Sequence, residues 1–228
     1  MNKKAIVIFA CLALQTLTPL AEAKPAWEIT IPPKQTFNLR EGLDYHASSQ
    51  YRQEVENAIN EAKKICQASI GDPSAAIVAD LDETLLDSTK HYRLYHVNEA
   101  DGESKFDHAI WEKYLVKAEA DEIKPVADFV RWAHENKIAV FLITGRHEKF
   151  RKSTCENLAK LNIPFDDLFM ETNQAQPYRA EDFKTDHRRT IERRGYRIIC
   201  NIGDQWSDLY GLHCQECIKL PNRMYFTE

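Results

Sequence analysis

The sequence predicts an α/β protein built around a doubly wound parallel sheet with helices on both faces. Three short apolar runs, at residues 75–79, 138–143 and 197–202, each follow a segment in which apolar residues recur at helical spacing. Continuous apolar runs of this length are typical of strands buried on both faces, and alternation with helices is typical of parallel sheets. The chain has 228 residues, of which 43% are hydrophobic, so one core can form without a disulfide or metal scaffold.

The N-terminus, residues 1–23, is predicted to be a secretory signal peptide. Lys3 and Lys4 precede an apolar stretch over residues 5–14, and small residues follow at Ala21-Glu22-Ala23. A positive start, a short apolar run and small residues at a cleavage point are the order of such peptides. We therefore expect cleavage near Ala23 and a secreted or periplasmic protein.

A membrane anchor and a lipid anchor are the alternatives for this segment. Gln15, Thr16, Thr18 and Pro19 interrupt the apolar run before the roughly 20 residues that a membrane span needs. No stable membrane span is therefore expected. Lipid attachment at Cys11 is a minor alternative.

Two segments precede the first predicted strand. Residues 24–48, which contain three prolines, are expected to form an irregular N-terminal arm on the main domain, residues 49–228. Residues 49–66 are expected to form an amphipathic helix, because apolar side chains recur there at helical spacing. These side chains belong to Tyr51, Val55, Ala58, Ile59, Ala62 and Ile65.

Each of the three predicted strands ends in a polar cluster. The clusters are Asp80-Leu81-Asp82, Thr144-Gly145-Arg146 and Gly203-Asp204. Open parallel sheets bind ligands outside the carboxyl ends of their strands, so the three clusters are expected to converge on one site. Residues 86–124 are more than one crossover needs, and we expect them to form a small helical cap with a helix near residues 106–120.

The residues alone leave two interpretations of the pair Asp80 and Asp82. If a turn brings both carboxylates into one pocket, they can serve as nucleophile and proton shuttle. Most Asp-x-Asp pairs are instead solvated turns or helix caps, and Gly203-Asp204 allows the same alternative.

Five cysteines remain after removal of the signal peptide: Cys66, Cys155, Cys200, Cys214 and Cys217. In an oxidising compartment an odd number leaves at least one thiol free or paired between chains. Cys214 and Cys217 have the spacing of a zinc half-site or a redox pair, but no second such pair and no thioredoxin-like context accompany them. Two buried thiols or a tight local disulfide are favoured, and the pairing stays open.

Four motifs follow one another along the chain. They are Asp80-Leu81-Asp82-Glu83-Thr84, Ile143-Thr144-Gly145-Arg146, Lys184, and Gly203-Asp204-Gln205-Trp206-Ser207-Asp208. This series resembles that of the haloacid dehalogenase superfamily of phosphatases, and most closely its secreted acid phosphatase branch. That branch includes bacterial class B and C acid phosphatases and plant vegetative storage proteins. The resemblance extends from about Arg40 to Tyr225 and implies a haloacid dehalogenase-like, Rossmann-type fold with a cap.

The resemblance implies a catalytic role for both aspartates of the first motif. Asp80 would attack phosphorus and form an aspartyl-phosphate, which divides one difficult displacement into two easier ones. Asp82 would protonate the departing alcohol and then deprotonate the water that hydrolyses the intermediate. Because Asp82 must first carry a proton, hydrolysis is expected to be fastest on the acid side of neutrality.

The other motifs would supply donors to the phosphoryl group, whose oxygens gather negative charge during transfer. The Thr144 hydroxyl, the backbone amide of Gly145 and the Lys184 ammonium would hold these oxygens. Arg146 either contacts the substrate phosphate or pairs with an acid, and the sequence does not decide between the two.

Asp80, Asp82 and Asp204 form an oxygen-rich set without a nearby His or Cys, which suits Mg²⁺. By the resemblance, the ligands would be the Asp80 carboxylate, the Asp82 backbone carbonyl and the Asp204 carboxylate. Asp208 would lie behind the metal and hold a water molecule or Lys184.

These features predict a secreted, Mg²⁺-dependent acid phosphatase that hydrolyses small phosphomonoesters. A phosphotransferase with an alcohol acceptor and a non-enzymatic storage or binding protein on the same fold are the alternatives. The formal charge of −5 lacks the basic excess of nucleic-acid-binding proteins, so no nucleic-acid partner is expected.

Aromatic residues predict the substrate preference. Tyr92 and Tyr95 of the cap, with Trp206 at the opposite rim, are expected to face the substrate, whereas Phe106 and Trp111 are expected to fill the core of the cap. Aromatic faces stack on nucleobases and aryl groups. Nucleoside monophosphates and aryl phosphates are therefore expected to be better substrates than glycerol phosphate.

Overall fold

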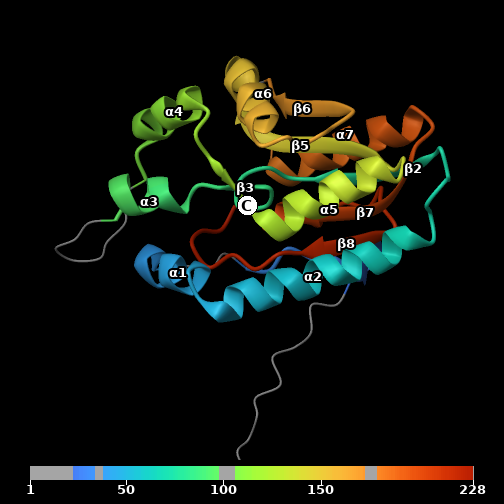
Figure 1. Cartoon of the computed structure of the whole chain (residues 1–228), viewed down its shortest axis with the longest axis horizontal. Helices are drawn as coiled ribbons and strands as arrows, with labels where there is room; N and C mark the ends of the chain where they lie inside the picture. Colours follow the sequence, from blue (N-terminus) through green and yellow to red (C-terminus); the bar gives the residue numbers. More distant parts are fainter. Residues whose placement is uncertain (1–22, 34–37, 98–105, 173–178, 228) are drawn as a thin grey trace, which may run out of the picture.

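The computed structural model describes residues 23–33, 38–97, 106–172 and 179–227 (Figure 1). The predicted signal peptide before Ala23, including Cys11, lies outside the described residues. Among the helices of the described residues, none combines the length and the apolar character needed to cross a membrane.

The fold is α/β, as predicted, and its main sheet has the strand order β1-β8-β7-β2-β5-β6. The three predicted strands lie side by side at its centre, where β2 pairs in parallel with both β5 and β7. The outer strands β6 and β8 are also parallel to their neighbours, and only β1 runs antiparallel. The bounds are β1 Lys24–Pro25, β2 Ala75–Ala79, β5 Ala139–His147, β6 Asp167–Glu171, β7 Arg197–Gly203 and β8 Glu216–Lys219.

Helices cover both faces of this sheet because successive side chains of a strand point to opposite faces. Ala75, Ile77 and Ala79 of β2 belong to one core, packed against α2, α5 and α6. Ala76 and Val78 belong to a second core, packed against α7. These helices are α2 Ser49–Gln67, α5 Lys124–Glu135, α6 Arg151–Lys160 and α7 Ala180–Arg193 (Figure 1). The predicted helix over residues 49–66 is thereby confirmed.

The N-terminal arm departs from its prediction. Residues 39–46 form the helix α1 (Leu39–His46) rather than irregular chain, because the Asn38 side chain caps its first turn by accepting a hydrogen bond from the Glu41 amide at 3.2 Å. Near the start of the arm, Ala26–Glu28 form a short 3-10 helix beside β1.

The described residues of the insertion after β2 form two short strands and two helices. The strands β3 (Leu86–Asp87) and β4 (Asp121–Glu122) pair antiparallel, so the chain enters and leaves the insertion at the same place. Between them lie α3 (Thr89–Tyr95) and α4 (His108–Lys117), and α4 ends before residue 120 because Ala118 turns into the left-handed conformation with φ 53°.

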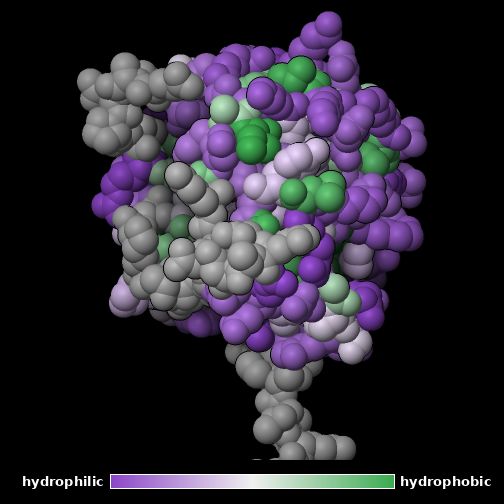
Figure 2. Space-filling view, turned by 90° about the vertical axis from the view of Figure 1, so that its left-hand side faces the viewer, coloured by the Kyte–Doolittle hydropathy of each residue, from purple (hydrophilic) through white to green (hydrophobic). Residues whose placement is uncertain are grey.

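The carboxyl ends of the parallel strands and the insertion lie at the same end of the molecule, on the left of Figure 1. Figure 2 looks onto this end and shows hydrophobic residues as separate patches among hydrophilic ones. The polar clusters predicted from the sequence stand at the carboxyl ends of β2, β5 and β7, and they therefore lie at this end of the sheet.

Candidate active site

A tight turn after β2 brings Asp80 and Asp82 to one cavity. The amides of Leu85 and Leu86 both donate to the Leu81 carbonyl, at 2.9 and 2.8 Å, and Glu83 adopts a φ of 56°. This reversal ends the strand and leaves the carboxylates of Asp80 and Asp82 on the wall of the same cavity.

The cavity has a volume of about 510 Å³. It is lined by side chains from all four sequence motifs and by residues of the cap and of the C-terminal tail. From the motifs come Asp80, Asp82, Thr144, Gly145, Lys184, Asp204, Gln205, Ser207 and Asp208. The predicted convergence of the strand ends is thereby confirmed.

Lys184, on the second turn of α7, lies between two of these carboxylates. Its Nζ is 2.5 Å from Asp80 Oδ1 and 2.5 Å from Asp208 Oδ1, and all three side chains are buried. Burial lowers the pKa of Lys184, but the charges of Asp208 and Asp80 outweigh burial and raise the pKa above its ordinary value. The side chain is therefore an ammonium that faces the cavity.

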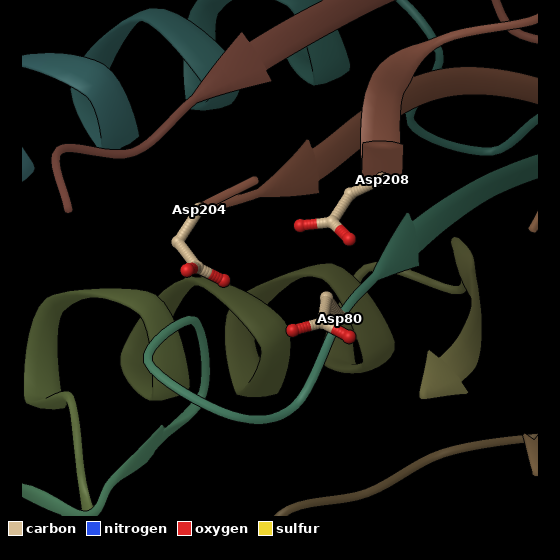
Figure 3. Close-up of side chains that lie close together, drawn as sticks. All are labelled: Asp80, Asp204 and Asp208. Carbon is tan, nitrogen blue, oxygen red and sulfur yellow. The ribbon is translucent and has the colours of Figure 1, made fainter. Parts of the chain in front are cut away.

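Asp80, Asp204 and Asp208 direct their carboxylates toward a common space (Figure 3). One oxygen of each lies within 4.8 Å of the others. Burial raises the pKa of Asp80 well above its ordinary value; the Lys184 charge opposes this, while Asp208 and Asp204 raise the pKa further. The three buried carboxylates outnumber the two ammonium groups beside them, Lys184 and Lys219, so negative charge is left uncompensated, and an all-oxygen set of this kind fits a hard divalent cation. The Asp82 side chain is not part of this set.

Arg146 pairs with an acid in this structure, which is one of the two alternatives that the sequence left open. Its Nε donates to Asp82 Oδ2 at 2.9 Å and its Nη2 to Oδ1 at 2.6 Å, while Nη1 donates to the Thr154 hydroxyl. The guanidinium is buried and is not among the residues that line the cavity. It therefore holds the Asp82 carboxylate in a two-point contact.

Three side chains to which the sequence assigned no role hold Asp204. The Thr84 hydroxyl donates to Asp204 Oδ1 at 2.9 Å, and the side-chain amides of Gln205 and Asn222 each donate to Asp204 Oδ2 at 2.7 Å. Thr84 and Gln205 belong to the recognised motifs, so their positions carried a signal. Asn222 is remote in sequence, and its contact follows from the path of the C-terminal tail.

The C-terminal tail forms one wall of the cavity through Met224, Tyr225, Phe226 and Thr227. The Tyr225 hydroxyl donates to Glu83 Oε2 at 2.6 Å, and the Gln205 side chain accepts from the Thr227 amide. The tail is thus fastened to two motif residues, which no local feature of the sequence indicates.

The aromatic rim differs from its prediction. Tyr92 lines the cavity as expected, but Phe106 and Trp111 line it as well instead of only filling the cap. Tyr95 stands at the end of α3, half exposed and outside the cavity. Trp206 packs against the cluster of Ala26, Ile29, Leu209 and Cys217, because the arm and β8 lie beside it.

Over residues 8–228 the sequence matches the family model described as HAD superfamily, subfamily IIIB (Acid phosphatase). It is 30% identical over 203 residues to Acid phosphatase 1 of Solanum lycopersicum, covering 86% of this chain and 76% of that protein. It is 29% identical over 155 residues to Vegetative storage protein 1 of Arabidopsis thaliana, covering 66% and 54% of the two chains.

Among solved structures, the fold is similar to that of the class C acid phosphatase from Bacillus anthracis with tungstate bound. The TM-score is 0.68 at 21% sequence identity, with 83% of this chain and 85% of that chain covered. This likeness shows the same fold, including a mostly parallel central sheet.

Proposed function

Because the chain belongs to the acid phosphatase family of the HAD superfamily, subfamily IIIB, we propose that it hydrolyses small phosphomonoesters through an aspartyl-phosphate on Asp80. One observation carries this assignment: Asp80 lies on the wall of the cavity with its Oδ1 2.5 Å from the buried Lys184 ammonium. A carboxylate held beside a positive charge can approach an anionic phosphoryl group, because the ammonium offsets the repulsion between them.

In the proposed first step, an Asp80 oxygen attacks phosphorus as the bond from phosphorus to the ester oxygen breaks. Asp82 donates its proton to the departing oxygen, so the product leaves as a neutral alcohol. Lys184, the Thr144 hydroxyl and the Gly145 amide face the cavity and can donate to the phosphoryl oxygens.

In the proposed second step, Asp82 takes a proton from water while the water oxygen attacks phosphorus and the bond to Asp80 breaks. The two contacts with Arg146 fix the direction of the Asp82 carboxylate in both steps. Arg146 is thus proposed as a positioning residue for the proton shuttle.

We further propose that the carboxylates of Asp80 and Asp204 hold Mg²⁺ together with the Asp82 backbone carbonyl, and that Asp208 lies behind the cation, where its carboxylate accepts from Lys184. The all-oxygen donor set and its excess negative charge support Mg²⁺ over zinc, which favours nitrogen and sulfur ligands. When bound, the cation supplies positive charge to the phosphoryl oxygens.

Chelation tests the metal assignment. Exhaustive treatment with EDTA is expected to lower the rate of phosphate release by about tenfold or more, and addition of Mg²⁺ is expected to restore the rate. Mg²⁺ should also raise the thermal unfolding midpoint, because it binds only the folded protein. Asp204→Asn should reduce that shift, whereas Asp128→Asn, a half-exposed carboxylate on α5, should not. Full activity after chelation would remove the metal from the proposal.

The aromatic walls of the cavity support a preference for nucleoside monophosphates and aryl phosphates. Their kcat/KM values are expected to exceed that of glycerol phosphate by about tenfold or more, since stacking contributes about 1–3 kcal/mol per base. Trp111→Ala should reduce this ratio. Tyr95→Ala is the matched control, because that ring lies outside the cavity. Equal kcat/KM values across these substrates would contradict the preference.

We also propose that residues 1–23 direct the protein to a secreted or periplasmic location and are removed near Ala23. The positive, apolar and small-residue order of the segment supports this. N-terminal sequencing of the exported protein should give Lys24 as the first residue.

A storage role is a second candidate, because relatives of this chain are named vegetative storage proteins. The presence of Asp80 beside Lys184 favours an enzyme. Steady-state turnover separates the two roles, and an excess of alcohol acceptor reveals any phosphotransfer as a new phosphate ester.

A further inference from the structure

The segment that links Asp208 to β8, residues 210–215, is organised by a buried arginine. Arg188 of α7 is fully buried and donates to the carbonyls of Asp208 at 2.6 Å, Leu212 at 3.0 Å, and Tyr210. Residues 211–213 in the linking segment all have positive φ, between 63° and 95°. Such a path is unfavourable for Leu212 and His213, so the segment depends on its contacts to stay in place.

Two cysteines close the end of this linking segment. Cys214 is its half-buried fifth residue, and Cys217 is the buried second residue of β8, beside Asn201 of β7. Their sulfur atoms are 3.3 Å apart, in contact but not bonded. The Cys217 thiol also donates a weak hydrogen bond to the Leu209 carbonyl at 3.6 Å, on the other side of the segment.

We propose that Cys214 and Cys217 form a site of reversible oxidation, and that the disulfide between them fastens the linking segment to β8. This site is separate from the proposed phosphatase chemistry, but the segment it fastens begins directly after the helix that carries Asp208. The Asp208 carbonyl accepts from Arg188 and Asn201, and its carboxylate accepts from Lys184.

Thiol–disulfide exchange with a small disulfide such as oxidised glutathione supplies the oxidant. The Cys214 thiolate attacks one glutathione sulfur, forms a mixed disulfide and releases one glutathione thiolate. The Cys217 thiolate then attacks the Cys214 sulfur, so the protein disulfide forms and a second glutathione thiolate leaves. Two protein thiols lose their protons and are oxidised, and one glutathione disulfide is reduced.

The surroundings favour Cys214 as the thiol that attacks first. The contact with the Cys217 sulfur lowers the pKa of Cys214, burial opposes this, and the charge of Arg188 lowers the pKa further. A lowered pKa and partial exposure are the conditions under which a thiol reacts. Cys66 and Cys200, by contrast, are completely buried in the main core.

Differential alkylation of the purified protein at rising ratios of oxidised to reduced glutathione tests the proposal. Cys214 and Cys217 are expected to lose their reactivity together, in a peptide lighter by two hydrogen atoms, while the other three cysteines keep theirs. The oxidised protein should unfold at a temperature higher by roughly 4 °C, because a short covalent loop restricts the unfolded chain. Amide hydrogen exchange over residues 209–216 should slow on oxidation.

Variants make the result specific. Cys217→Ser should trap the glutathione adduct on Cys214, and Cys214→Ser should abolish the oxidation-dependent rise in unfolding temperature. Cys155→Ser, a half-buried cysteine on α6, should behave as the unmodified protein. The proposal is overturned if Cys214 and Cys217 stay alkylatable at every ratio, if Cys66 and Cys200 pair instead, or if exchange over residues 209–216 is unchanged by oxidation.

Discussion

Asp80→Asn is expected to lower phosphate release by roughly four orders of magnitude or more while the protein stays folded. The amide has nearly the shape of the carboxylate and can still accept a hydrogen bond from Lys184. It cannot form the acyl-phosphate, because its oxygen is a poor nucleophile toward phosphorus. Burial already opposes ionisation of Asp80, so removing its charge should leave the free energy of unfolding largely intact.

The measurement is kcat with an aryl phosphate, together with circular dichroism and the thermal unfolding midpoint of the same preparation. Asp128→Asn is the matched control, since it makes the same chemical change on the outer surface of α5. It should keep full activity, because surface ion pairs contribute little and the residue is outside the cavity. A folded Asp80→Asn protein with more than about one hundredth of the original rate would assign the nucleophile to another residue.

Much of the fold could be predicted because its central strands carry a local signal. Residues 75–79 are apolar without alternation, and β2 is indeed buried on both faces. The convergence of Asp80, Thr144 and Asp204 followed from a general property of parallel sheets, whose carboxyl ends share one edge. The cavity that these side chains share was therefore predictable without knowledge of any side-chain contact.

Contacts between remote segments could not be predicted in the same way. Asn222 and Tyr225 reach the site only because the tail returns across the cavity after β8. Trp206 turns away from the cavity because the arm at Ala26 and Ile29 covers it. The pairing of Arg146 with Asp82 likewise depends on the turn after β2. That turn requires a left-handed backbone conformation at Glu83, which has no signature in the sequence.

Asp82→Asn is expected to reduce steady-state turnover by roughly 10²–10⁴-fold, the range typical of lost general acid–base catalysis. Asn keeps one oxygen that can accept from Arg146, so the variant should remain folded. It has no proton to give the leaving group and cannot take one from water. Both proposed steps should therefore slow, but not equally for every substrate.

Esters with different leaving groups distinguish the effects of Asp82→Asn on the two proposed steps. A nitrophenolate departs without a proton, so the first step should stay fast in Asp82→Asn with nitrophenyl phosphate, while water attack on the aspartyl-phosphate stays slow. Rapid mixing should then show a burst of nitrophenol equal to the enzyme concentration, followed by slow turnover. An alkyl phosphate, whose alkoxide needs the proton, should show no burst because its first step has become slow. Equal slowing of both esters without a burst would mean that Asp82 serves neither the leaving group nor the water, and that its contact with Arg146 is structural only.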